Sequence, residues 1–279
     1  MANWETITGN LATPRGFRAS AVAAGIRKDK AALDLALIVS DAPETTAAGV
    51  FTTNLVAAAP VTYSRWALKE SRGRCRALVV NAGNANACTG KAVLRAAERT
   101  ARATAKLLGI SPEQVLVAST GVIGVPLNAE LIASQLPALK ESLSAEDAGA
   151  LPQAMMTTDT FPKCCVLRSE LGGKAVHLAG IAKGAGMIHP RLATMLSFIT
   201  TDAVIAPRML QHTLEAAVAV SFNRITVDGD TSTNDTVLVL ASGLAGVAVR
   251  PGRESRAWFL AGLTELCQTL ARMIAKDGE

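Results

Sequence analysis

The change from short apolar runs to long helical periods constrains the fold of this chain more than any other feature. Residues 33–39, 49–53 and 76–80 are short runs rich in β-forming residues, and each is predicted to be a strand. Residues 92–108 repeat apolar side chains at helical spacing, and Gly109 ends the pattern. Strands mixed with a few long helices predict layered sheets flanked by helices rather than a simple βαβ repeat.

Three further helices are predicted from their first turns and from amphipathic periods. Asn128 can cap a helix that runs towards Leu143. Pro207 suits the first turn of a helix over residues 208–220, and residues 256–276 are strongly amphipathic. We expect these helices to cover the sheets.

Composition and charge limit the classes of function. The chain has 279 residues, 49% of them hydrophobic, which can bury a sizeable core in one large or two modest domains. The longest apolar stretches, such as residues 237–241, are too short to span a bilayer, and residues 1–5 lack a basic-then-apolar signal. We therefore expect a cytoplasmic protein without a membrane segment. The net charge of +5 is spread along the chain and predicts no nucleic-acid partner.

The five cysteines carry no metal or disulfide pattern. Their number is odd and their spacing is not that of paired ligands. Adjacent residues on a strand point to opposite faces, so Cys164 and Cys165 should separate. We expect all five to be reduced, buried thiols, at positions 75, 88, 164, 165 and 267.

The segment over residues 183–196 has the character of a site for self-cleavage. Two glycines and a proline precede Thr194, which opens an apolar run. A threonine hydroxyl becomes a useful nucleophile when the α-amine of the same residue is free to act as its base, which requires cutting the Ala193–Thr194 bond. A bent glycine loop could bring the Thr194 hydroxyl to the Ala193 carbonyl and give an ester that water opens. The alternative is an ordinary glycine turn that leads into a buried strand or helix.

Five motifs together identify the chain as similar to one family. They lie at residues 81–90, 119–124, 156–160, 183–194 and 224–236. In this order they resemble the ArgJ family of arginine biosynthesis, whose members are called glutamate N-acetyltransferases or ornithine acetyltransferases. The resemblance runs from Pro14 to the last residue, and five long motifs in order are far more specific than any one of them.

The resemblance implies a fold, a maturation step and a reaction. The fold is an α/β (α+β) arrangement, an αββα sandwich of stacked sheets flanked by helices, of the N-terminal-threonine-nucleophile acyltransferase type. Cleavage gives an α piece of residues 1–193 and a β piece of residues 194–279, which stay associated, two of each in a heterotetramer. The enzyme moves an acetyl group from N-acetylornithine to Thr194 and then to glutamate. No cofactor is implied, although some members accept acetyl-CoA as the acetyl donor.

The same resemblance gives roles to two residues that would stabilise the oxyanion. Thr120 and Gly121 match the family's oxyanion hole, which binds the tetrahedral intermediate of acyl transfer. Residues 115–118 are predicted to be a buried strand that ends at Ser119, so the next turn could present a hydroxyl and a backbone N–H. Without the resemblance, residues 119–121 are an ordinary turn.

Three more residues match substrate-binding positions of the family. Thr157 matches a substrate contact, and Lys183 could hold the α-carboxylate of glutamate or ornithine. Glu279, the last residue of an Asp-Gly-Glu motif, could bind the ammonium group of ornithine. The alternatives are an exposed lysine at Lys183 and a frayed terminus at Glu279.

The remaining polar motifs are interpreted as structural. Residues 228–235 lack the twelfth-position Glu and the helix pair of a calcium loop, so we predict a tight polar turn near the active site and no metal. Asn81, Asn84 and Asn86 should order a loop, because the glycines there lack dinucleotide-binding spacing. His189 is interpreted as a loop residue near the cleavage point rather than as a member of a catalytic triad.

The sequence departs from the family at its C-terminal side. Family members continue past the Asp-Gly-Glu motif with a segment that adds substrate contacts, and no match to that segment is present here. We therefore expect part of the pocket and core to be absent, and little transacetylase activity from these residues alone. Two other hypotheses stay open: a related N-terminal-nucleophile amidohydrolase or aminopeptidase, and an inactive, shortened subunit with only an interaction role.

Overall fold

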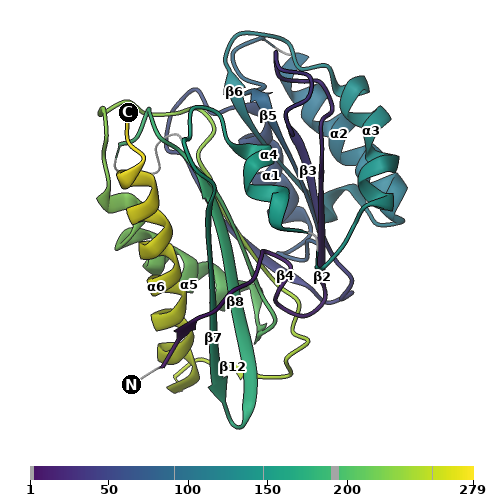
Figure 1. The fold of residues 1–279 in the computed structure, drawn as a ribbon. Coiled ribbons are helices and arrows are strands. Elements are labelled where there is room, and N and C mark those ends of the chain that lie inside the picture. Colours follow the sequence, from purple (N-terminus) through teal and green to yellow (C-terminus); the bar gives the residue numbers. More distant parts are fainter. Residues whose placement is uncertain (1–2, 91, 147, 190–194, 253) are drawn as a thin grey trace.

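Two stacked sheets form the centre of the computed structural model, which describes residues 3–90, 92–146, 148–189, 195–252 and 254–279 (Figure 1). The larger sheet has six strands in the order β1-β7-β8-β9-β11-β4. Their bounds are β1 (Glu5–Thr6), β7 (Lys163–Leu171), β8 (Lys174–Lys183), β9 (Leu196–Thr201), β11 (Thr236–Ala241) and β4 (Thr46–Phe51). Only β9 and β11 pair in parallel, and all other neighbours in this sheet are antiparallel.

The smaller sheet has four strands in the order β2-β3-β5-β6. These are β2 (Phe17–Val22), β3 (Leu35–Ser40), β5 (Ala77–Asn84) and β6 (Val115–Val122). The pair β5–β6 is parallel, so the carboxyl ends of both strands reach the same edge. A short parallel pair, β10 (Val204–Ile205) and β12 (Ala248–Val249), stands apart from both sheets.

Helices cover both outer faces of the stacked sheets. Helices α5 (Pro207–Ala219) and α6 (Glu254–Lys276) pack on the larger sheet, and α2 (Ala92–Leu108) and α3 (Ala129–Glu141) pack on the smaller one (Figure 1). Helix α1 (Ala59–Glu70) contacts β6 and α2, and the short α4 (Leu151–Met155) contacts strands of both sheets. Three 3-10 helices, Pro112–Gln114, Ala148–Ala150 and Phe222–Arg224, complete the described helices. The layers therefore form the αββα sandwich that the resemblance implied.

Alternation along β11 shows how the larger sheet joins two cores. Leu238 and Leu240 belong to a core that also includes the smaller sheet, whereas Val237 and Val239 belong to the core beneath α5 and α6. A strand that is apolar on both faces, as this one is, must be covered on both sides. This explains why the run over residues 237–241 contains no polar side chain.

Most elements predicted from local pattern are present with small shifts in their bounds. Helix α2 covers the predicted residues, and the Asn128 side chain caps α3 by accepting from the N–H groups of Glu130 and Leu131. Helix α6 begins two residues before the predicted start. The prediction for β6 was wrong at one end: the strand does not end at Ser119 but continues to Val122. No helix in the described ranges combines the length and apolarity that crossing a membrane requires.

The cysteine predictions are confirmed in part. All five cysteines are free thiols, and Cys164 and Cys165 do lie on opposite faces of β7, each packed against a different core. Burial was wrong for Cys88, which is exposed, and incomplete for Cys164.

Candidate functional site

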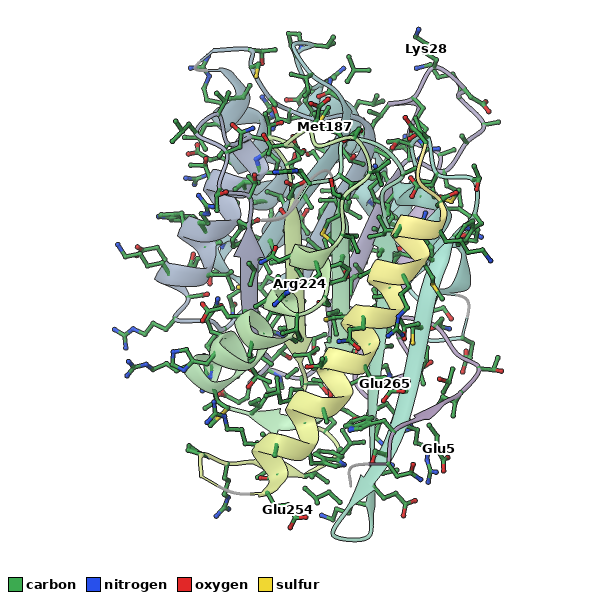
Figure 2. The ribbon with its side chains drawn as sticks, turned by 90° about the vertical axis from the view of Figure 1, so that its left-hand side faces the viewer. Glu5, Lys28, Met187, Arg224, Glu254 and Glu265 are labelled. Carbon is green, nitrogen blue, oxygen red and sulfur yellow. The ribbon has the colours of Figure 1, made fainter. Side chains whose placement is uncertain are left out.

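A cleft of about 920 Å³ lies where the ends of β5, β6 and β8 meet. It is lined by residues of seven segments: Ile26, Arg27, Lys28, Gly83, Asn84, Thr120, Gly121, Val122, Val125, Thr157, Thr158, Lys183, Gly186, Met187, Asp228, Asp230 and Glu279. Figure 2 shows Lys28 and Met187 at the same end of the molecule, opposite Glu254 at the start of α6. The five described residues with a predicted catalytic or binding role all lie along this cleft.

Thr120 and Gly121 lie at an irregular end of the β5–β6 pair. The register with β6 shifts at Gly83 and Asn84, and such irregularities at strand ends often re-aim groups beside active sites. Gly121 has φ +129°, and a Cβ there would stand 2.4 Å from the backbone carbon of Gly83. Only glycine fits this position, because any other residue would place a Cβ against the backbone of β5.

Amide side chains hold this edge of the smaller sheet. The Ser119 hydroxyl donates to Asn81 Oδ1 at 2.7 Å, and Asn81 Nδ2 donates to the carbonyl of Asn84 at 2.9 Å. Asn84 Oδ1 in turn accepts the N–H of Asn86 at 2.7 Å. The prediction that these asparagines order a loop is confirmed in part: Asn81 and Asn84 belong to β5 itself, and only Asn86 lies in the loop, where its Nδ2 donates to the Val93 carbonyl at 3.1 Å.

Lys183 joins two other candidate residues. It is the last residue of β8 and is 2% exposed, so the exposed-lysine alternative is wrong. Its Nζ donates to Thr157 Oγ1 at 2.6 Å and to Thr120 Oγ1 at 3.3 Å. Burial lowers the pKa of Lys183, the Asp159 carboxylate opposes that shift, and the Lys163 ammonium adds to it. The lysine is therefore a buried cation with hydroxyl partners at the floor of the cleft.

A buried ionic cluster stands behind Lys183. Lys163 Nζ lies 2.8 Å from Asp159 Oδ1 and 2.5 Å from Asp277 Oδ2, and all three side chains are at most 1% exposed. Burial acts to raise the pKa of Asp159, but Lys183, Lys163 and two backbone N–H groups outweigh it and hold that pKa below its usual value. Sequence reasoning gave no role to these three residues. The one available signal was that Asp159 and Asp277 lie inside recognised motifs.

Glu279 is docked against the loop that follows β8. Its N–H donates to the Ala185 carbonyl at 3.1 Å. A Cβ on Gly186 would stand 2.6 Å from Glu279 Oε2, so the carboxylate lies directly over that glycine. The frayed terminus is not what the structure shows.

Asp228 fixes the same loop from its other side. Its carboxylate accepts the N–H groups of Met187 and Ile188, the latter at 2.9 Å, and that of Asp230 at 3.1 Å. The tight polar turn predicted for residues 228–235 is confirmed. His189 is an exposed loop residue, as interpreted from the sequence.

Ala193 and Thr194, the predicted cleavage site and nucleophile, lie outside the described residues. The next residue, Met195, donates its N–H to Asp235 Oδ1 at 3.0 Å and accepts from the N–H of Thr236 at 3.1 Å. Asp235 is fully buried, and burial raises its pKa well above the usual value. A buried carboxyl group therefore holds the first described residue after the predicted nucleophile, a role that sequence reasoning missed.

Comparison with known sequences and structures adds a family context. A model of the ArgJ family matches residues 18–279. The arginine biosynthesis bifunctional protein ArgJ of Gloeobacter violaceus is 49% identical, across 100% of this chain and 68% of that protein. The chain thus spans about two thirds of the length of such relatives.

Solved structures agree with the observed fold. Ornithine acetyltransferase from Mycobacterium tuberculosis, complexed with ornithine, is 37% identical with a TM-score of 0.61, over 67% of this chain and 98% of that chain. An L-aminopeptidase D-Ala-esterase/amidase from Ochrobactrum anthropi has a TM-score of 0.60 over 99% of this chain and 88% of its own, but is only 12% identical. The second likeness shows a common fold alone.

Proposed function

Because the chain belongs to the ArgJ family, we propose that it takes part in acetyl transfer from N-acetylornithine to glutamate, which yields ornithine and N-acetylglutamate. The observation that carries this proposal is the position of Lys183, whose ammonium group bonds the Thr120 and Thr157 hydroxyls in a cleft that also holds Glu279. A cation and a carboxylate in one cleft suit a zwitterionic amino acid.

The proposed chemistry has two acyl-transfer steps. The Thr194 hydroxyl attacks the acetyl carbonyl carbon while the free α-amine of Thr194 takes the hydroxyl proton. The C–N bond of N-acetylornithine then breaks, and that proton passes to the departing amine of ornithine. The amine of glutamate attacks the acetyl-threonine ester in the same way and restores the hydroxyl.

Thr120 and Gly121 supply the oxyanion hole in this scheme. Since Thr120 Oγ1 accepts a bond from Lys183 Nζ, its own hydrogen is left to donate to the oxyanion. The lysine charge also strengthens that donor, because hydrogen bonds in a buried chain polarise one another. The Gly121 N–H is the second donor, as the resemblance implies.

Lys183 and Glu279 bind the two charged ends of the substrate. An ammonium group has three donors, and two of those on Lys183 are used by Thr157 and Thr120, which leaves one for an α-carboxylate. Glu279 accepts the side-chain ammonium of ornithine. Its exposed carboxylate lies on Gly186, at the edge of the cleft.

We also propose that maturation divides the chain at Ala193–Thr194. The pieces 1–193 and 194–279 would stay together because they share one sheet: β8 pairs with β9, and β4 pairs with β11. A heterotetramer of two α and two β pieces is part of the proposal.

Intact-mass spectrometry of the purified protein tests the nucleophile. We expect two fragments from the wild type, one full-length chain from Thr194→Ala, and partial cleavage from Thr194→Ser, which keeps a hydroxyl. Two fragments from the alanine variant would refute the role of Thr194.

A second experiment separates transition-state stabilisation from binding. Thr120→Ala should lower the limiting rate of transfer by about a hundredfold, with little change in glutamate saturation, because an oxyanion donor acts chiefly in the transition state. The reverse pattern would give Thr120 a substrate-binding role instead.

The same assay separates the alternative hypotheses. Acetate release from N-acetylornithine without glutamate would indicate an amidohydrolase. No reaction in either format, from protein whose fold is intact, would leave the interaction role.

A further inference from the structure

We propose that Lys163 is a positioning residue for the cleft: its buried ammonium group holds two carboxylates that fix the places of Thr157, Lys183 and Glu279. The inference rests on the proposed function only in that these three residues are taken as substrate contacts. Lys163 itself does not line the cleft, so it can act on a substrate only through the residues that it holds.

Lys163 is fully buried at the start of β7. Its ammonium group contacts Asp159 and Asp277 and stands 4.8 Å from the centre of the Phe161 ring. A buried charge is costly unless it is paired and hydrogen-bonded, and two carboxylates meet that need here. Because Asp277 is 114 residues away along the chain, the lysine joins two segments that are far apart in the sequence.

One arm of the cluster runs through Asp159 to two substrate contacts. Asp159 Oδ1 accepts the Gly184 N–H at 2.6 Å, directly after Lys183. Asp159 Oδ2 accepts the Thr157 N–H at 3.0 Å and lies 3.9 Å from Lys183 Nζ. The backbone on which both Thr157 and Lys183 stand is therefore bonded to a carboxylate that Lys163 holds.

The other arm runs through Asp277 to the C-terminus. Asp277 accepts the N–H of Thr160 at 3.0 Å as well as its hydroxyl. Two residues later, the N–H of Glu279 bonds the Ala185 carbonyl. Release of Asp277 would thus loosen the short segment that carries the Glu279 carboxylate to the cleft.

Charge balance gives the cluster a second effect on Lys183. Two lysines and two aspartates make a neutral unit, in which Asp159 is shared between both ammonium groups. Without Lys163, Lys183 would be the one cationic partner left to Asp159 among the described residues. The Lys183 charge would then be satisfied within the protein rather than offered to a substrate carboxylate.

Amide hydrogen exchange tests the two arms without any assumption about the substrate. In Lys163→Met, we expect the hydrogen-exchange rates of the Thr157, Gly184 and Thr160 amides to rise about tenfold or more. The amides of β9 should keep their protection. In Asp277→Asn the new side chain has nearly the same shape as the aspartate but no charge. This variant should speed exchange of the Thr160 and Glu279 amides and leave that of Thr157 unchanged. Arg168→Met is the matched control, because it removes an exposed ion pair with Glu170 from the same strand.

Ornithine titration calorimetry tests the link to binding with a double-mutant cycle. Lys163→Met should weaken ornithine binding about tenfold or more. In an Glu279→Gln background its effect should shrink, because one of the contacts that it positions is already lost. The proposal would be overturned if the fold-changes in ornithine affinity of the two substitutions simply multiplied in the double variant. Unchanged exchange rates at Thr157 and Gly184 in Lys163→Met would also overturn it.

The two kinds of failure remain distinct. If the wild type does not bind ornithine, the proposed substrate is wrong, whereas the exchange pattern still decides whether Lys163 organises the cleft. If Lys163→Met does not fold, Asp277→Asn alone decides: protection lost at Thr160 and Glu279 supports the role, and protection kept at both refutes it.

Discussion

The strands of the two sheets that reach the cleft contribute different chemistry to it. The ends of β5 and β6 contribute hydroxyls, amides and backbone, held by neutral hydrogen bonds such as those of Asn81 and Asn84, and the loop between β2 and β3 adds the charged side chains of Arg27 and Lys28. The larger sheet and its following loops contribute charges: Lys183 on the floor, with Lys163 and Asp159 behind it. The ends of β5 and β6 are therefore held in place by close backbone contacts, and the end of β8 by paired charges.

This difference predicts different responses to substitution. Where backbones are in close contact, an added side-chain atom destabilises the fold by steric overlap, because packed main chain cannot move away. Where charges are paired, stability depends on the charge of each group and should change with pH as well as with side-chain size.

The largest loss of stability is expected at the end of β6. Gly121→Ala should lower the free energy of unfolding by about 3 kcal/mol or more, since it combines a positive φ with overpacking against main chain. Gly124→Ala is the matched control: φ is +82°, but no atom lies within 4 Å of the added Cβ. It should cost only about 1 kcal/mol. Urea unfolding of both variants measures the difference, and equal losses would show that the contact with Gly83 is unimportant.

An intermediate effect is expected from Asp235, a buried acid on the side of the larger sheet. Burial raises its pKa well above 3.8, so the folded protein keeps this proton to a higher pH than the unfolded chain does. Its contribution to stability is therefore fully present below pH 3.8 and is lost as the pH rises through the folded-state pKa.

Asp235→Asn should remove that dependence while the side-chain oxygen still accepts from Met195. Denaturant unfolding across pH should show the wild type losing stability relative to the variant as pH rises, by at most about 1.4 kcal/mol per pH unit. Parallel curves would mean that Asp235 does not titrate with a raised pKa.

The smallest effect on stability is expected at Gly186. In Gly186→Ala the three atoms nearest to the added Cβ all belong to the end of the flexible Glu279 side chain, so the free energy of unfolding should change by less than about 0.5 kcal/mol. The displaced carboxylate should nevertheless weaken ornithine binding about tenfold. Gly149→Ala, with open space around it, is the control. Unchanged calorimetric affinity would argue against Glu279 as a contact.

Local patterns in the sequence were sufficient for most elements. The Asn128 cap and the helical period over residues 92–108 act within a few residues, so their effects are legible from the sequence alone. The end of β6 was missed because pairing with β5 carries the strand past the Ser-Thr-Gly turn signal. Turn propensity is weak beside a ladder of backbone hydrogen bonds supplied by a neighbouring strand.

The sequence by itself, through its resemblance to the family, determined the αββα layers and five of the residues that line the cleft. Motifs and periodicity act over short distances, and five motifs in order were specific enough to name Thr120, Thr157 and Lys183, while the Asp-Gly-Glu motif named Glu279. Only the tertiary structure decided that Lys183 is buried and that Lys163 pairs with Asp159 and Asp277. An isolated lysine is expected at the surface, because burying its charge is unfavourable. Two carboxylates reverse this preference for Lys163: Asp159 is close in sequence, whereas Asp277 comes from the far end of the chain and only folding brings it there.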